Sequence, residues 1–168
     1  MTVLDTILII IIIISIISMI CMACNNRFQI NIIRLNEAEA IIDKTLRKRY
    51  DLLNKVVNII RSETEEDKAL DNIKKSRSKK LNMYELDKEL NMGMAELKEI
   101  IKKYPELKTN EQYSNIAFGL AESESEINAF KKYYDDIAKD YNKMVKSFPS
   151  NLLAVLCGYK IKQYFNNK

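Results

Sequence analysis

The amino-acid sequence predicts an all-α protein, in which an N-terminal transmembrane helix is followed by an antiparallel up-down-up bundle of three long helices and a short C-terminal helix. Three observations support this fold class. An uncharged run of 18 residues, Ile7 to Cys24, stands near the start of the chain. Only 3 Gly and 2 Pro occur among 168 residues, and chains so poor in turn-forming residues are mostly helical. Apolar residues then recur at helical spacing along three stretches of similar length.

The uncharged run is long enough to cross a membrane. As a helix it spans about 27 Å, close to the thickness of the hydrocarbon core of a bilayer. A secretory signal begins with basic residues, whereas Met1–Thr6 has none and carries Asp5. A cleaved lipoprotein signal is the alternative, because Ala23-Cys24 fits its end, although the two residues before this pair do not. We therefore predict that residues 1–24 stay in membrane lipid as an anchor.

The basic residues that follow the run indicate its orientation. Arg27, Arg34 and Lys44 come after it, and no Lys or Arg precedes it. Because Lys and Arg favour the cytoplasmic side of a membrane, we expect a single-pass plasma-membrane protein with its N-terminus outside. The remaining residues, 25–168, are then cytoplasmic, and they are numerous enough for one helical-bundle domain with its own core.

Few residues interrupt the helical pattern of this domain. An acidic cluster begins at Ser62, Pro105 cannot continue a helix, and Pro149 interrupts the chain again. These breaks predict helices over about 25–62, 65–103 and 110–147, the third capped by Thr109 or Asn110. The anchor and the first of them are expected to form one continuous helix. A short helix from Leu152 to Cys157 should end at Gly158.

Each predicted helix carries an apolar stripe that should face the core. The third is the most regular, with one interruption at Ser123: Tyr113, Ile116, Leu120, Ile127, Phe130, Tyr134, Ile137, Tyr141, Met144 and Phe148. The first is comparable: Phe28, Leu35, Ala38, Ile42, Leu46, Leu53, Val56 and Ile60. The second is weaker and has a polar middle: Ala69, Ile73, Met83, Leu90, Met94, Leu97 and Ile101. Alternating steps of three and four residues are typical of helices packed against one another.

Basic residues of the first two helices form the main candidate docking surface. In an up-down-up bundle they share a layer far from the membrane with Asp135, Asp136 and Asp140 of the third helix. The basic members are Arg47, Lys48, Arg49, Lys74, Lys75, Arg77, Lys79 and Lys80. Such a layer would suit an acidic protein partner. The simpler interpretation is a solvated face, where an exposed ion pair contributes less than about 1 kcal/mol.

Aromatic residues near the C-terminus form a second candidate docking surface. Tyr159, Tyr164 and Phe165 follow the short helix, and the predicted bundle places them at the end far from the membrane. They either close the core there or offer an aromatic contact to a partner.

Most catalytic and metal-binding signatures are missing from the sequence. The chain has no His, which excludes Ser-His and Cys-His pairs and the Glu-x-x-His motifs of bundle metal sites. Its glycines are scattered, so no phosphate-binding loop is present. Cys21 and Cys24 have C-x-x-C spacing, which permits either a redox or metal role or apolar packing in lipid, and with Cys157 the count is odd. We expect no catalysis, no cofactor and no bound metal.

Three groups of residues resemble the LemA family of bacterial proteins. They are Arg47-Lys48-Arg49-Tyr50-Asp51-Leu52-Leu53; Tyr104-Pro105-Glu106-Leu107-Lys108-Thr109-Asn110-Glu111; and the set Leu120, Glu124, Ile127, Tyr133, Asp136, Tyr141-Asn142, Ser147-Phe148-Pro149-Ser150-Asn151 and Phe165. The resemblance covers nearly the whole chain. It implies a membrane-anchored antiparallel helical bundle with a partner role and no catalytic residues. Members usually have a proline where this chain has Asn54, so a bend expected in relatives should be absent here.

These observations favour a scaffold or adaptor for membrane protein partners. The alternative is a structural protein that self-associates as a homo-oligomer or lies on the bilayer and shapes it. The net charge of +4 is too small for a typical nucleic-acid-binding domain, so we expect no nucleic-acid partner.

Overall fold

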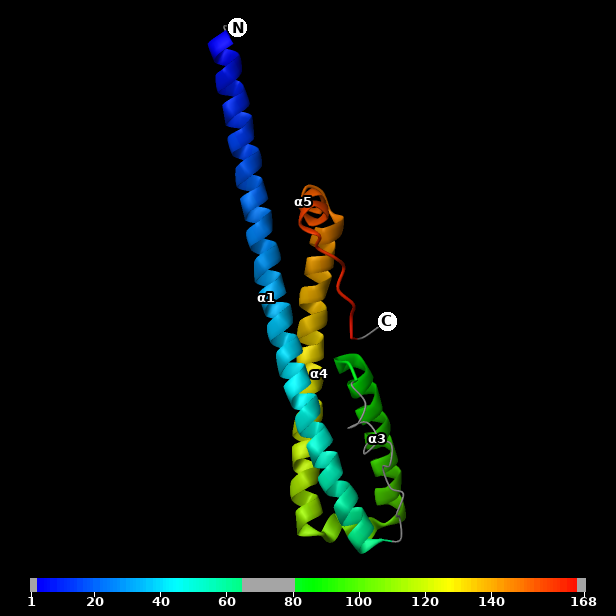
Figure 1. Cartoon of the computed structure of the whole chain (residues 1–168). Coiled ribbons are helices and arrows are strands. Elements are labelled where there is room, and N and C mark those ends of the chain that lie inside the picture. Colours follow the sequence, from blue (N-terminus) through cyan, green and yellow to red (C-terminus); the bar gives the residue numbers. More distant parts are fainter. Residues whose placement is uncertain (1–2, 65–80, 166–168) are drawn as a thin grey trace. The chain divides into compact units, whose positions relative to one another are not determined.

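Helices are the only regular secondary structure in the described part of the chain. The computed structural model describes residues 3–64 and 81–165, and it contains no β-strand within these ranges. Its helices are α1 (Val3–Glu63), α3 (Met83–Lys103), the 3-10 helix η1 (Pro105–Thr109), α4 (Glu111–Lys146) and α5 (Ser150–Cys157) (Figure 1). The predicted all-α fold class is confirmed.

Helix α1 joins the uncharged run to the first predicted bundle helix without a break. It is 61 residues long, and its N-terminal part is long and apolar enough to cross a membrane, with none of that part buried inside the protein. At Asn54, where a proline would bend the helix, the side-chain Nδ2 instead donates a hydrogen bond of 3.1 Å to the carbonyl of Tyr50. The predicted continuity of the helix is confirmed.

The start of α3 differs from the predicted start of the second helix. Residues 65–80 of the predicted helix over 65–103 lie outside the described ranges. Helix α3 begins at Met83, because Asn82 has an extended backbone and caps it. The Asn82 side chain accepts from the amide of Glu85, and the Glu85 carboxylate accepts from the amide of Asn82, a reciprocal capping box. The helix therefore does not run through this position.

The other predicted boundaries are confirmed. Helix α3 ends just before Pro105, and Asn110 caps α4 by accepting a hydrogen bond of 3.1 Å from the amide of Tyr113. Helix α5 ends at Gly158, whose positive φ of 70° favours glycine over residues with a Cβ.

The chain divides into two compact units. The terminal unit consists of Met1–Glu37 and Tyr133–Lys168, and the central unit is Ala38–Lys132. Helices α1 and α4 each contribute to both units, α3 belongs to the central unit and α5 to the terminal unit.

In the central unit, α3 runs in the same direction as α1, and α4 runs against both (Figure 1). Contacts between α1 and α4 move backwards along α1: Asn110 lies 3.4 Å from Glu63, and Lys48 lies 2.8 Å from Glu122. Arg49 of α1 contacts Asn91 in the first half of α3. Helix α3 then leads into η1, which is followed by Asn110 beside Glu63 at the C-terminal end of α1, so α1 and α3 run in the same direction. The predicted up-down-up order is therefore wrong in its second and third members, because an apolar stripe specifies a face of a helix and not its direction.

The apolar stripes fill the interiors of both units. All eight predicted core residues of the first stripe are fully buried, from Phe28 to Ile60. Leu90, Leu97 and Ile101 of the second stripe are also buried, whereas Ala69 and Ile73 lie outside the described residues. In the third stripe Phe148 is an exception and is 79% exposed.

The C-terminal tail is fastened into the terminal unit. Tyr159 stacks on Phe28 with ring centroids 4.6 Å apart, and Phe28 meets Tyr141 edge-on at 5.7 Å. Further along the tail, the Asn142 side chain makes two hydrogen bonds of 2.8 Å to the backbone of Lys162. The tail thus begins beside the residues that follow the uncharged run, and the predicted location at the end of the bundle far from that run is wrong.

We expect the buried phenol of Tyr141 to make the folded terminal unit less stable at alkaline pH. Burial raises the pKa of Tyr141 above its ordinary value of 10.0, and Tyr159 raises it further. A raised folded-state pKa gives a contribution to stability that is complete below pH 10 and is lost as the pH rises through the folded pKa. Tyr141→Phe should reduce this loss, as measured by urea unfolding at about pH 8 and about pH 11. A pH dependence identical to that of the wild type would contradict the assignment.

Candidate functional site

Two of the predicted docking residues are exposed and engaged with carboxylates. Arg47 donates to Asp43 at 2.8 Å one helical turn away, and Lys48 donates to Glu122 of α4 at 2.8 Å. The hydrogen bond from each cation to its carboxylate raises the pKa of both basic groups. Such exposed pairs add little to stability, and both side chains remain accessible to a partner.

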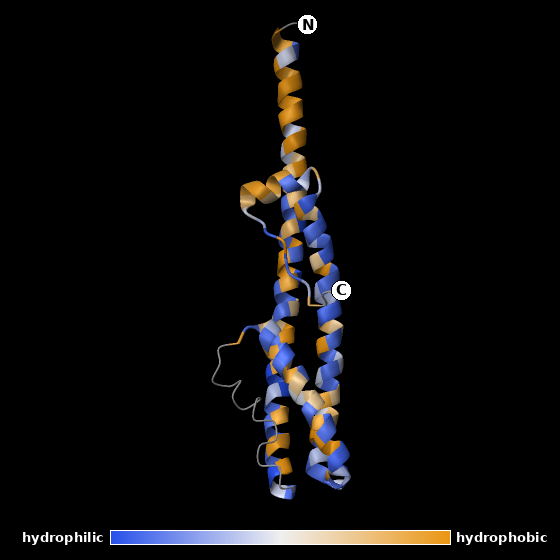
Figure 2. Cartoon of the chain, turned by 90° about the vertical axis from the view of Figure 1, so that its right-hand side faces the viewer, coloured by the Kyte–Doolittle hydropathy of each residue, from blue (hydrophilic) through white to orange (hydrophobic). Residues whose placement is uncertain are grey.

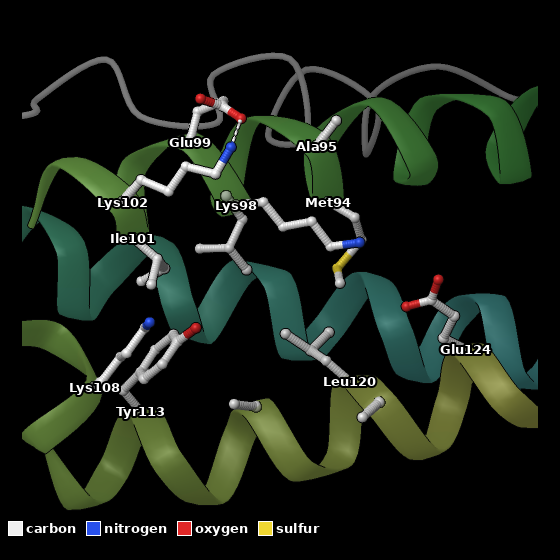
Figure 3. A pocket seen from close by; sticks show the side chains of 13 residues that line it. Met94, Ala95, Lys98, Glu99, Ile101, Lys102, Lys108, Tyr113, Leu120 and Glu124 are labelled. Carbon is white, nitrogen blue, oxygen red and sulfur yellow. Dashed lines mark hydrogen bonds and ion pairs between the residues drawn. The ribbon is translucent and has the colours of Figure 1, made fainter. Parts of the chain in front are cut away.

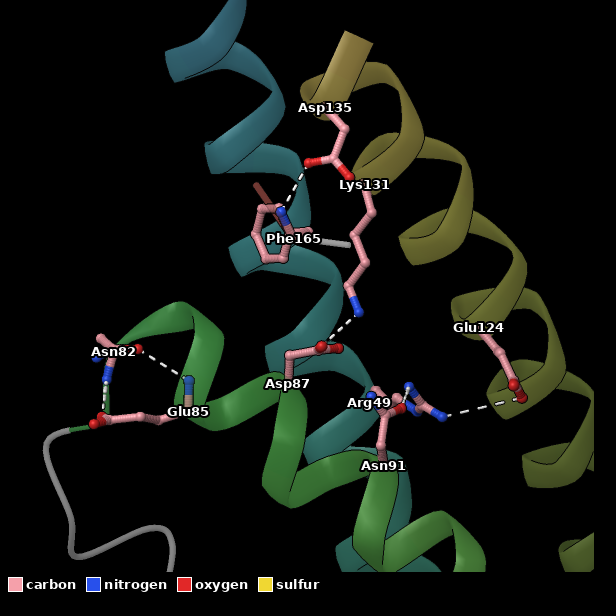
Figure 4. Close-up of polar contacts among 9 residues, drawn as sticks. All are labelled: Arg49, Asn82, Glu85, Asp87, Asn91, Glu124, Lys131, Asp135 and Phe165. Carbon is pink, nitrogen blue, oxygen red and sulfur yellow. Dashed lines mark hydrogen bonds and ion pairs between the residues drawn. The ribbon is translucent and has the colours of Figure 1, made fainter. Parts of the chain in front are cut away.

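Arg49 lies inside the central unit and not on its surface. Only 2% of the residue is exposed, and its guanidinium donates to Asn91 Oδ1 at 3.1 Å and lies 4.0 Å from the Glu124 carboxylate (Figure 4). Burial lowers the pKa of Arg49, an effect that Glu124 and Asp87 oppose. Its Nε has no hydrogen-bond partner in the described part of the chain. Arg49 therefore holds three helices together and is not available for docking.

A second buried charge pair joins α3 to α4 in the same unit. Lys131 Nζ lies 2.5 Å from Asp87 Oδ2, and the two side chains are only 11% and 14% exposed (Figure 4). Sequence reasoning did not single out this pair. The spacing of Lys131 within the apolar stripe could have indicated that it is buried. Lys131 stands four residues after Ile127 and three before Tyr134, both of which are buried. Arg49 occupies the equivalent place between Leu46 and Leu53 of α1.

The predicted cationic layer is not assembled among the described residues. Its acidic members on α4 were expected to be Asp135, Asp136 and Asp140, but Lys48 and Arg49 meet Glu122 and Glu124 instead. The acidic residues opposite Lys48 and Arg49 differ from the predicted ones because of the direction of α3 and the observed register of α4 against α1. The other five basic residues lie outside the described ranges: Lys74, Lys75, Arg77, Lys79 and Lys80.

The predicted aromatic surface is largely used for internal packing. Tyr159 is half-buried on Phe28, and its hydroxyl donates to Asn25 at 3.1 Å and accepts from Gln29 at 2.8 Å. Phe165 meets the ring of Tyr134 edge-on at 5.2 Å, and its amide donates to the Asp135 carboxylate at 2.8 Å (Figure 4). Tyr164 is half-buried. These contacts leave little of the three rings for a partner.

A groove lies between α3 and α4 in the described part of the central unit (Figure 3). Its volume is about 570 Å³, and its walls carry Met94, Leu97 and Ile101 from α3 and Tyr113 and Leu120 from α4. These residues continue the apolar stripes of both helices. The groove is therefore an apolar channel that follows two packed helices, the form that an amphipathic helix recognises in a partner.

The rim of this groove carries more positive than negative charge. Lys98, Lys102 and Lys108 stand on it together with Glu99 and Glu124. Glu99 is paired with Lys102 at 2.7 Å, and Glu124 faces the buried Arg49. In the part of the chain that the structure describes, no carboxylate pairs with Lys98 or Lys108. The groove thus combines an apolar floor with two cations that an acidic ligand would neutralise.

The described residues offer no arrangement of acidic or thiol groups for a metal. No cluster of three or more His, Cys, Asp or Glu side chains converges within these ranges. The thiols of Cys21 and Cys157 are exposed and that of Cys24 is partly exposed, and all three are free.

Comparison with known proteins identifies the family of the chain. The family model described as "LemA family" matches residues 38–168. Magnetosome proteins MamQ 1 and MamQ 2 of Paramagnetospirillum magneticum are each 28% identical to this chain over 76 residues, which is 45% of the chain. The match spans only 28% of the length of these two relatives. Since the family model covers most of the sequence, this chain belongs to the LemA family.

Proposed function

We propose that this protein is a membrane-anchored helical adaptor that binds other membrane proteins and catalyses no reaction. The observation that carries the proposal is the continuity of α1, because one helix of 61 residues leads from an apolar stretch long enough to cross a bilayer into the packed central unit. An anchor that continues along one helix into a packed helical unit would hold that unit close to one membrane. Proteins of the same membrane are then the most accessible partners.

The α3–α4 groove is the proposed docking surface, and an acidic amphipathic helix of a membrane protein is its proposed occupant. Such a helix would place apolar residues against Leu97, Ile101 and Leu120 and carboxylates near Lys98 and Lys108. Helix-in-groove recognition uses this combination of an apolar floor and a charged rim. In the proposed topology the N-terminus is outside the plasma membrane and the central unit is cytoplasmic, as the basic residues after the anchor favour.

Site-specific photocrosslinking in native membranes tests this proposal. A photoreactive amino acid at Ala121, which lines the groove, should capture a reproducible set of membrane proteins. The matched control is the same residue at Phe118, which is 77% exposed on the same helix and does not line the groove. The charge reversals Lys98→Glu and Lys108→Glu should weaken capture at Ala121. Equal capture at both positions, or capture that the charge reversals leave unchanged, would contradict the groove as docking surface.

A further inference from the structure

Helix α5 exposes an apolar surface that no described residue covers. Leu152 is 59% exposed, Val155 83% and Leu156 84%, and Phe148 just before the helix is 79% exposed. On the other side of α5, Ala154 is buried in the terminal unit. The helix is therefore oriented with three of its larger apolar side chains outward.

The location of α5 brings this surface to the end of the membrane anchor. The amide of Tyr159, just after α5, donates to Ala154 of that helix at 2.9 Å, and the Tyr159 hydroxyl donates to Asn25 at 3.1 Å. Asn25 directly follows Cys24, the last residue of the uncharged run. Within the terminal unit, Figure 2 shows the hydrophobic α5 beside α1 where the hydrophobic stretch of α1 ends.

The charges around α5 match the surface of an anionic bilayer. No charged residue occurs between Lys146 and Lys160, and both of these lysines are exposed. Uncharged apolar side chains bordered by Lys are typical of segments that enter the headgroup region, where the Lys side chains extend towards anionic lipids. Tyr159 at the junction also fits this setting, because tyrosine is enriched where a membrane meets water.

We propose that α5 and Phe148 form a second membrane contact, which inserts into the headgroup region of the leaflet from which α1 emerges. This inference rests on the proposed anchoring of α1, because the bilayer must end near Asn25 for α5 to reach it. The contact would fix the terminal unit to the membrane at two places. The occupant is the lipid bilayer and not a protein, since α5 is tethered directly beside the anchor and lipid is the apolar phase at that position.

Tryptophan fluorescence in the full-length chain can locate α5 against the bilayer. The protein has no Trp, so each substitution introduces the single Trp of that variant. Leu156→Trp reports on α5, Ile12→Trp reports on the middle of the anchor, and Phe118→Trp is the matched exposed control on α4. Each variant is reconstituted into phosphatidylcholine–phosphatidylglycerol vesicles that carry bromine either near the headgroups or near the bilayer centre.

We expect bromine near the headgroups to quench Leu156→Trp and to leave Phe118→Trp unquenched, with the emission of Leu156→Trp shifted to shorter wavelength. Ile12→Trp should be quenched most strongly by bromine at the bilayer centre. If Ile12→Trp is quenched and Leu156→Trp is not, the contact of α5 is refuted and the anchor stands. A blue-shifted but unquenched Leu156→Trp would mean that a protein or a second copy covers α5, which also overturns the inference. If Ile12→Trp itself escapes quenching, the proposed anchoring fails together with the inference.

Discussion

Replacing Asp87 with Ala is expected to lower the free energy of unfolding of the central unit by about 3–5 kcal/mol. The substitution leaves the Lys131 ammonium in a site where its side chain is only 11% exposed and where Asp87 Oδ2 is its partner at 2.5 Å. The cost comes from a buried ammonium that has lost its carboxylate partner Asp87 and not from the loss of a strong attraction, because a buried pair gains little over its own desolvation. Urea unfolding of the full-length protein in detergent, followed by circular dichroism, measures the change.

Two further variants separate this explanation from a general loss of packing. Asp87→Leu combined with Lys131→Met removes both charges and keeps apolar volume, so it should recover most of the lost stability. Glu99→Ala breaks the Lys102–Glu99 pair, whose side chains are 73% and 71% exposed, and it should cost less than about 1 kcal/mol. A double variant as unstable as Asp87→Ala would show that the charge of Lys131 is not the cause.

The sequence was sufficient to predict which faces of the helices are buried. Steps of three and four residues identified the first stripe, and all of its members are fully buried. The same steps also pass through three polar residues, Arg49, Ser123 and Lys131, which the structure buries. Ser123 satisfies its hydroxyl by donating to the Leu120 carbonyl at 2.7 Å. Residues that interrupt an apolar stripe in register were thus the signal for the internal polar contacts, whereas the charge of Arg49 had suggested a docking surface.

The direction of a helix and the location of the tail could not be predicted in the same way. An apolar stripe is the same whether a helix runs up or down, so the assumption that every joint reverses the chain gave α3 and α4 the wrong directions. The Asn82–Glu85 capping box was a readable local signal for the start of α3. No comparable signal connects Tyr159 to Asn25 and Phe28, because these residues are far apart in sequence and meet only in the folded terminal unit. The groove between α3 and α4 likewise depends on the pairing of two helices.

Phe28→Ala is expected to destabilise the terminal unit by about 3–5 kcal/mol, a cost typical of deleting a buried aromatic ring. Phe28 is fully buried and lies between Tyr141 of α4 and Tyr159 of the tail. Its loss leaves a cavity where α1, α4 and the tail meet. Because Phe28 contacts α4 through Tyr141, the effect should be measured locally, by hydrogen exchange of buried amides in α4 such as those of Ile137 and Ala138. A loss of 3 kcal/mol corresponds to a decrease in protection of about a hundredfold.

Phe118→Ala is the matched control for this prediction, because it deletes the same ring from a position on α4 that is 77% exposed. Its effect should stay within about 0.5 kcal/mol. Phe28→Leu keeps most of the buried volume and should cost less than the alanine variant. If Phe28→Ala leaves the exchange of Ile137 unchanged, the tail and α4 are not held by this aromatic cluster. The contact that places α5 near the end of the uncharged run would then depend mainly on the hydrogen bonds of the Tyr159 hydroxyl to Asn25 and Gln29, and Tyr159→Phe should weaken it.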